Sequence, residues 1–199
     1  MPSQLTLDPT RTAVLCMDYQ TGIVSNYIKD EHLLPHAASV LKQARSAGMP
    51  VIYVQVCFRP NFPEISPRNA AFSAIKTSPQ YQQMLSGPGR EIHSSVAPEA
   101  DDIIVTKHRV GAFAGTDLDM ILRAKDIDTL ILFGISTSGV VLSTLRHAAD
   151  TDYRLIVIKD CCADLDPEVH ACLMDKVFPR QASVAVAAEF LDALKRLML

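Results

Sequence analysis

Short apolar runs that alternate with helical patterns are the feature that most constrains how this chain can fold. The first run is apolar on both faces, which is typical of a strand buried inside a parallel sheet. Six such runs predict strands, over residues 12–18, 51–56, 102–107, 129–133, 154–158 and 183–186. Helical patterns lie between or after them, over residues 30–47, from about 116, over 138–150, from 167 and over 188–198. This alternation predicts an α/β fold, a three-layer, doubly wound parallel sheet of Rossmann-like topology with helices on both faces.

Length and composition indicate one globular domain over residues 1–199. The chain is 48% hydrophobic and 21% charged, which suits a packed α/β domain, and no linker or repeat divides it. A net charge of −3 argues against nucleic-acid binding, which usually requires a basic surface. No apolar stretch approaches the ~20 residues that span a bilayer, and the first six residues show no signal pattern. We therefore expect a cytoplasmic protein with neither a nucleic-acid nor a membrane partner.

The cysteines and glycines predict no cofactor. The five cysteines are odd in number and show no CxxC pairs or histidines at the spacing of zinc ligands. The glycine-containing turn at 134–139 lacks both the GxGxxG pattern and the Walker lysine that bind nucleotide phosphates. The sequence therefore predicts neither a metal site nor a nucleotide site.

Polar residues stand at the ends of three predicted strands. Asp18 ends the first run, Lys107 ends the 102–107 run, and a tight turn from Gly134 leads from the 129–133 run into a helix. Ligands of open parallel sheets bind at the carboxyl ends of strands, so these three points should meet there. Burial at a strand end would raise the pKa of the Asp18 carboxyl towards the range that suits proton transfer. Asp18 and Lys107 are therefore candidate catalytic residues, and a purely structural ion pair is the alternative.

A proline-rich stretch, residues 58–79, breaks the alternation and predicts a long loop. Loops of this length in compact domains are often functional. Arg59 in this stretch could hold a carboxylate, and His108 and Phe113 beyond the 102–107 strand could line the same pocket. These candidates predict a small-molecule substrate that is acidic or carries a carboxamide.

The strand ends also carry a set of short motifs, which extend over nearly the whole chain. They include Asp18-Tyr19-Gln20, Lys107-His108-Arg109 with Phe113, Gly115-Thr116-Asp117-Leu118, and Gly134-Ile135-Ser136-Thr137. Together they resemble the isochorismatase-like hydrolases, the cysteine hydrolase superfamily. The resemblance implies a cysteine nucleophile that attacks an amide or related carbon, an aspartate that acts as general base and acid, and a lysine that stabilises charge. It also implies a homo-oligomer, a dimer or a tetramer.

The resemblance assigns a further role to the turn after the 129–133 strand. It implies a cis peptide bond between Ile135 and Ser136, and backbone amides around Ser136, Thr137 and Gly139 that hold a developing oxyanion. Nicotinamidases of the superfamily also carry zinc held by an Asp and histidines after the second strand. Residues 57–64 contain no histidine, so we expect neither that metal nor nicotinamidase activity.

The position of the nucleophile, six residues after Gly134, is occupied by Val140. An aliphatic side chain cannot attack a carbon, so a thioester route through this position is excluded. Three hypotheses remain. Asp18 and Lys107 could hydrolyse a substrate without a cysteine, as in the isochorismate-cleaving members of the family. A hydroxyl could replace the thiol, from Ser136, Thr137, Ser138 or Ser143. The pocket could instead bind a ligand or a protein partner without turnover. We take hydrolysis through Asp18 and Lys107 as the leading hypothesis.

Overall fold

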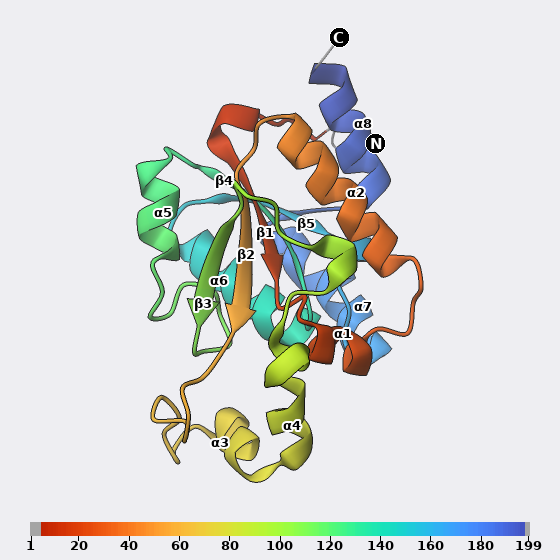
Figure 1. The fold of residues 1–199 in the computed structure, drawn as a ribbon. Helices are drawn as coiled ribbons and strands as arrows, with labels where there is room; N and C mark the ends of the chain where they lie inside the picture. The colour runs from red at the N-terminus through yellow and green to blue at the C-terminus, as the bar shows by residue number, and fades with distance from the viewer. Residues whose placement is uncertain (1–4, 198–199) are drawn as a thin grey trace.

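One six-stranded sheet forms the centre of the computed structural model, which describes residues 5–197 (Figure 1). All six strands are parallel and lie in the order β3-β2-β1-β4-β5-β6. They are β1 (Thr12–Met17), β2 (Val51–Val56), β3 (Ile103–Lys107), β4 (Thr129–Gly134), β5 (Arg154–Ile158) and β6 (Ser183–Ala185). The predicted α/β fold with a doubly wound parallel sheet is confirmed.

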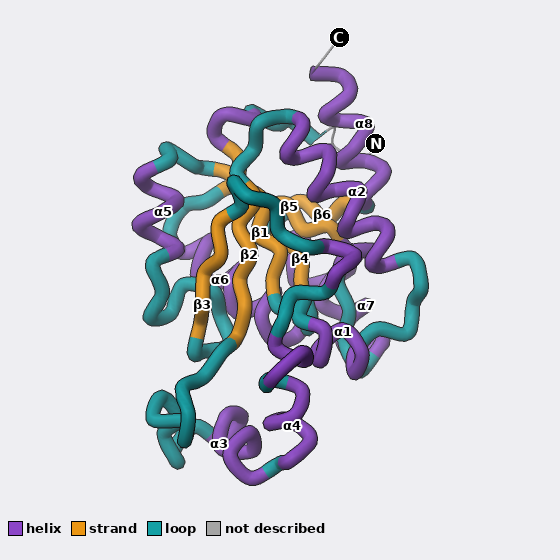
Figure 2. Tube along the Cα trace, viewed as in Figure 1, coloured by secondary structure: helices purple, strands orange, loops and turns teal. Residues whose placement is uncertain are grey.

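Helices cover both faces of the sheet (Figure 2). They are α1 (Thr21–Tyr27), α2 (Leu33–Ser46), α3 (Ala70–Thr77), α4 (Pro79–Met84), α5 (Leu118–Ala124), α6 (Leu142–Asp150), α7 (Pro167–Cys172) and α8 (Ala187–Leu197). α2 and α8 pack together on one face, and α5 and α6 lie on the other (Figure 1). The predicted closing helix is present as α8, and its expected last residue, Met198, lies outside the described residues. Within residues 5–197, no helix has the length and apolarity to cross a membrane.

The two central strands, β1 and β4, form the middle of the core. Every residue of both strands is buried, which explains why their sequences are apolar on both faces. β1 pairs with β2 on one side and with β4 on the other. Because the strand order reverses between β1 and β4, their carboxyl ends flank the crevice where such sheets bind ligands. The fold therefore directs attention to Asp18 and to the turn after Gly134.

The proline-rich stretch after β2 is not the simple loop that the sequence predicts, because it contains α3 and the start of α4. The prolines at 60, 63 and 67 all precede Asn69, whose side chain caps α3 by accepting a hydrogen bond from the Phe72 N–H. Pro79 occupies the first turn of α4, where a missing N–H loses no helical hydrogen bond. The two helices extend from the carboxyl edge of the sheet (Figure 1).

Candidate active site

Asp18 leaves β1 in an unusual backbone conformation. Its φ is 58°, in the left-handed region that Asp and Asn enter more readily than most other residues. Its N–H donates to the Val54 carbonyl at 2.8 Å, which ties the end of β1 to β2. The side chain stays inside the protein, and the residue is only 5% exposed. The turn therefore presents a carboxylate at the carboxyl end of the sheet without exposing it to bulk water.

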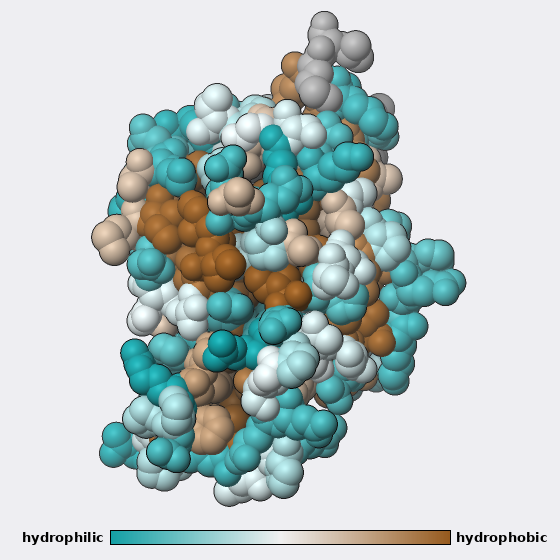
Figure 3. All heavy atoms as spheres, in the orientation of Figure 1, coloured by the Kyte–Doolittle hydropathy of each residue, from teal (hydrophilic) through white to brown (hydrophobic). Residues whose placement is uncertain are grey.

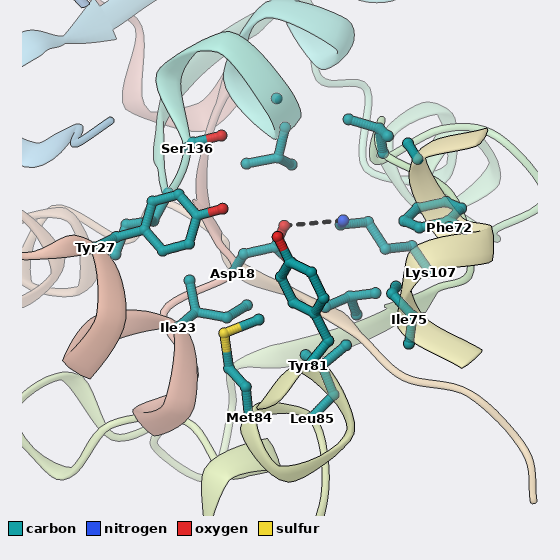
Figure 4. A pocket seen from close by; sticks show the side chains of 16 residues that line it. Asp18, Ile23, Tyr27, Phe72, Ile75, Tyr81, Met84, Leu85, Lys107 and Ser136 are labelled. Carbon is teal, nitrogen blue, oxygen red and sulfur yellow. Dashed lines mark ion pairs between the residues drawn. The ribbon is translucent and has the colours of Figure 1, made fainter. Parts of the chain in front are cut away.

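Lys107, the last residue of β3, pairs with this carboxylate (Figure 4). Its Nζ lies 2.9 Å from Asp18 Oδ2 and also donates to the Arg109 carbonyl at 3.1 Å. Both charged side chains are buried. The other oxygen, Asp18 Oδ1, is buried as well and has no hydrogen-bond partner among the described residues. The ion pair therefore satisfies one oxygen of the carboxylate and leaves the second free.

Burial controls the protonation of this pair. It raises the pKa of the Asp18 carboxyl above its ordinary value, and the charge and hydrogen bond of the adjacent Lys107 ammonium offset only part of that effect. A carboxyl with a raised pKa exchanges its proton closer to neutral pH, which is the property that a general acid or base needs. Asp18 therefore has both the position and the protonation behaviour of a proton-transfer group.

The turn after β4 brings four further residues to the same place, Ile135, Ser136, Gly139 and Val140. The peptide bond between Ile135 and Ser136 is cis, as the family resemblance implies. A Cβ on Gly139 would lie 2.7 Å from Ser136 Oγ, so a larger residue at this position would force the Ser136 side chain to move. Val140 follows, is 2% exposed, and faces the space beside Asp18 with Ile135 and Ser136. The turn thus presents mainly apolar groups to Asp18.

The backbone amides of this turn are already engaged. The Thr137 N–H donates to the Ala163 carbonyl at 2.8 Å, and the Ser138 N–H donates to Asp164 Oδ2 at 2.7 Å. The Gly139 N–H donates to the Ser136 carbonyl at 3.2 Å. In this arrangement these three N–H groups are not free to hold an oxyanion.

A cavity of about 230 Å³ lies beside the Asp18–Lys107 pair (Figure 4). Its walls away from the sheet come from α1, α3 and the α4 region, through Ile23, Tyr27, Phe72, Ile75, Tyr81, Met84 and Leu85. The site residues that the sequence predicts include none of these seven. Within each segment they are spaced three or four apart, which is the signature of one helical face and could have indicated a shared surface.

Three residues expected in the substrate pocket lie outside the lining of this cavity. The Arg59 side chain is 68% exposed and pairs with Glu64 at 2.6 Å. Phe113 is buried and stacks on His147 with ring centroids 4.5 Å apart. The His108 ring contacts the Cys57 carbonyl and lies near Phe58. The structure therefore brings Asp18 together with Lys107 but not with Arg59, His108 or Phe113.

The alternative hydroxyls are placed differently from one another. Ser136 is the hydroxyl of that group that lines the cavity. Thr137 is fully buried, and its Oγ1 lies 2.8 Å from His170 Nδ1. Ser138 is exposed, and Ser143 packs against Gly111. The described residues contain no cluster of three or more His, Cys, Asp or Glu side chains arranged to hold a metal ion.

Comparisons with known proteins identify the family and agree with the fold. The isochorismatase domain model matches residues 12–189. The isochorismatase family protein YwoC of Bacillus subtilis strain 168 is 32% identical over 202 residues, covering 98% of this chain and all of that protein. The ureidoacrylate amidohydrolase RutB of Rhizobium rhizogenes strain K84 is 30% identical over 187 residues, covering 84% of this chain and 76% of that enzyme.

Solved structures give the same result. An isochorismatase family protein from Burkholderia thailandensis superposes with a TM-score of 0.82 at 28% identity, covering 97% of this chain and 100% of that chain. A cysteine hydrolase from Pseudomonas syringae pv. phaseolicola 1448A superposes with a TM-score of 0.85 at 25% identity, covering 96% of each chain. The similarity therefore extends over the whole sheet and its helices, not only over the motifs.

Proposed function

The chain belongs to the isochorismatase family, and from this premise we propose that it hydrolyses a small metabolite with Asp18 and Lys107 and without a cysteine nucleophile. An amide is the favoured substrate, because the relative RutB is an amidohydrolase and an uncharged carboxamide needs no cation in the pocket. Val140 stands where the family resemblance expects the thiol, and its side chain offers no group that could form a covalent intermediate.

The observation that carries this proposal is the free oxygen of Asp18. Oδ2 is held by Lys107, whereas Oδ1 has no partner among the described residues in a carboxylate that lines the cavity. An unpartnered buried oxygen is unfavourable unless a ligand, water or proton completes it. We assign Oδ1 the task of taking a proton from the attacking water.

The proposed reaction is a direct attack of water on the amide carbonyl. Asp18 Oδ1 accepts one proton as the water oxygen bonds to the carbonyl carbon, whose π electrons move onto the carbonyl oxygen. The carbon–nitrogen bond then breaks, and the proton on Asp18 passes to the leaving nitrogen. The products are a carboxylic acid and an amine or ammonia, and Asp18 returns to its starting state. Lys107 keeps the carboxylate positioned and supplies positive charge as the oxyanion forms.

Two observations favour a second candidate function, a ligand-binding protein without turnover. Val140 is inert, and the N–H groups of Thr137, Ser138 and Gly139 already have acceptors within the chain. Such a protein would retain the cavity and the ion pair as a binding site only.

Product formation with purified protein separates these functions. Isochorismate and a panel of small amides are incubated with the wild type, Asp18→Asn and Val140→Cys, and products are followed by liquid chromatography. Asp128→Asn is the matched control, because Asp128 pairs with Arg11 on the surface. We expect wild-type turnover that Asp18→Asn lowers by about 10²- to 10⁴-fold and that Asp128→Asn leaves unchanged. A silent wild type beside an active Val140→Cys variant would instead establish the binding protein.

The cytoplasmic location and the homo-oligomer remain predictions. Apolar side chains reach the surface on the face shown in Figure 3, and Ile104 on the edge strand β3 is 50% exposed. Edge strands with apolar side chains are natural pairing surfaces, which agrees with an oligomer. Light scattering of the purified protein measures its mass and decides between a monomer and a dimer or tetramer.

A further inference from the structure

We propose that the cavity beside Asp18 selects uncharged substrates with an apolar body, and that the hydroxyls of Tyr27 and Tyr81 bind the polar group of such a substrate. The inference rests on the proposed function only in placing the reacting atom at Asp18. It replaces the expectation of an acidic substrate held by Arg59, whose side chain lies outside the cavity lining.

The charges around the cavity cancel within the protein. Among the described residues that line it, Lys107 is the cation and Asp18 is the anion, and they pair at 2.9 Å. An anionic substrate would enter this space without a free cation to receive it and would lie beside the Asp18 carboxylate. Burying such a charge without a partner is strongly unfavourable, whereas an uncharged substrate avoids this loss. The ion pair thus favours a neutral ligand.

The walls of the cavity are mostly apolar. Ile75, Met84 and Leu85 face it from the α3–α4 segment, and Ile135 and Val140 face it from the turn after β4. An apolar substrate body gains free energy by leaving water for such a surface. The cavity has a volume of about 230 Å³. The site therefore fits a compact substrate with a short apolar body.

Two tyrosines supply the polar contacts that the apolar walls lack. Figure 4 shows the hydroxyls of Tyr27 and Tyr81 directed towards the space around Asp18. The buried hydroxyls of Tyr19 and Tyr53 donate to backbone carbonyls at 2.6 and 2.8 Å. Among the described residues, the hydroxyls of Tyr27 and Tyr81 have no such acceptor. They are therefore available to donate to a substrate carbonyl.

The protonation of Tyr27 suits this role. Burial raises the pKa of its hydroxyl above the ordinary value, and the nearby Tyr81, Asp164 and Asp18 raise it further. The hydroxyl therefore keeps its proton at neutral pH and can act as a hydrogen-bond donor. Tyr81 lies on the opposite helix, α4, and is 39% exposed. Both side chains line the cavity that contains Asp18.

Isothermal titration calorimetry with three probes of similar size tests the proposal through binding rather than turnover. Isovaleramide is neutral and apolar, isovalerate replaces its amide by a carboxylate, and succinamate keeps an amide but adds a carboxylate. We expect isovaleramide to bind at least about tenfold more tightly than either anion, because each anion must bury an unpaired charge.

Variants of the tyrosines test the second half of the proposal. Tyr27→Phe and Tyr81→Phe should each weaken isovaleramide binding by about three- to tenfold, the effect of one lost hydrogen bond, without lowering the melting temperature. Tyr153→Phe is the matched control, since Tyr153 lies outside the cavity lining, near Phe113, with ring centroids 6.2 Å apart. It should leave binding unchanged.

The outcomes separate this proposal from the proposed function. Selective binding of isovaleramide that depends on the tyrosines supports the inference even if no substrate is turned over. Equal or tighter binding of either anion overturns it, even if the protein proves to be a hydrolase. Undetectable binding of isovaleramide, or binding that neither Tyr→Phe variant weakens, overturns it as well.

Discussion

Two ion pairs lie at opposite ends of β3, the Asp102–Arg45 pair at its amino end and the Asp18–Lys107 pair at its carboxyl end. They differ in how many of the carboxylate oxygens have hydrogen-bond partners. Asp102 lies just before β3, and its side chain is 5% exposed. Both of its oxygens accept from Arg45 on α2, at 2.6 to 3.2 Å, and Oδ2 also accepts from the Glu99 N–H at 2.7 Å. Asp18 is equally buried, but only Oδ2 has a partner and Oδ1 has none among the described residues.

The difference teaches which pair is built for stability and which for chemistry. A bidentate arginine and a backbone N–H make the Asp102 pair a complete structural link between α2 and the sheet. The Asp18 pair uses a lysine, which contacts one oxygen and leaves the other without a partner among the described residues, in a carboxylate that lines the cavity. Incompletely satisfied buried groups lower stability, so their presence next to a cavity points to function. Three predictions test this contrast, and another tests the helices that cover the cavity.

The largest expected effect is on activity. Asn is the appropriate replacement for Asp18, because Asn tolerates the left-handed φ of 58° at this position. Asp18→Asn should lower kcat by about 10²- to 10⁴-fold, since an amide cannot accept the proton from water. Asp102→Asn should change kcat by less than about twofold, because Asp102 does not line the cavity. Steady-state assays on the same amide measure both variants. A comparable kcat loss in Asp102→Asn would remove the contrast.

The second prediction concerns the free energy of unfolding. Removing both charges at the structural pair, with Arg45→Met and Asp102→Asn, should lower it by about 3 kcal/mol, because Tyr53 and the Glu99 carboxylate lose their contacts with Arg45 too. Removing both charges at the site, with Lys107→Met and Asp18→Asn, should change it by less than about 1 kcal/mol or raise it. Urea unfolding of both double variants measures the difference. A larger loss at Asp18 would show that this pair is structural.

The fold could be predicted from the sequence because of the pattern in its central strands. β1 and β4 are buried on both faces, so their side chains must be apolar throughout, and that pattern is visible without any tertiary information. Three short helices, α1, α3 and α4, were not accessible, although α5 and α7 were. α1 has seven residues, and α3 and α4 depend on the side-chain caps Asn69 and Ser78 within a stretch where prolines dominate the pattern.

The residues of the site also differ in whether the sequence predicts their position. Asp18 and Lys107 could be paired from the sequence, because residues at the ends of parallel strands share one edge of the sheet. The cavity walls could not be predicted, since their position depends on the path that residues 58–92 take beyond the carboxyl ends of the strands. Arg59 is an example. Its guanidinium pairs with Glu64, five residues further along the chain, and the sequence alone does not indicate whether Arg59 would pair with Glu64 or with a substrate.

The third prediction tests whether the packing of α1 against α4 positions Tyr27 and Tyr81 beside Asp18. A Cβ on Gly22 of α1 would lie 2.1 Å from the backbone oxygen of Met84 on α4, so Gly22→Ala must displace one helix from the other. We expect kcat/KM to fall about tenfold, mainly through KM, with stability lowered by about 1–3 kcal/mol. Ser25→Ala, on the exposed side of the same helix, is the control. An unchanged KM would show that α4 does not position the substrate.

The smallest expected effect is a pH dependence of stability that distinguishes the two carboxylates. Because burial raises the pKa of Asp18, the folded protein binds more protons than the unfolded chain between the unfolded pKa, near 3.8, and the folded one. The free energy of unfolding should therefore fall as pH rises through this window and level off above the folded pKa. The double variant with Asp18→Asn and Lys107→Met lacks both groups, so its difference from the wild type isolates their contribution.

Urea titrations of the wild type and this variant at steps of pH from about 4 upwards measure that difference. A difference that declines with pH means that desolvation outweighs the Lys107 charge, which leaves Asp18 able to hold a proton for transfer. A difference that grows with pH would mean that the ammonium dominates and keeps the carboxyl ionised, as a structural salt bridge does. Asp18 would then resemble Asp102, and the free oxygen would have to be explained by bound water rather than by catalysis.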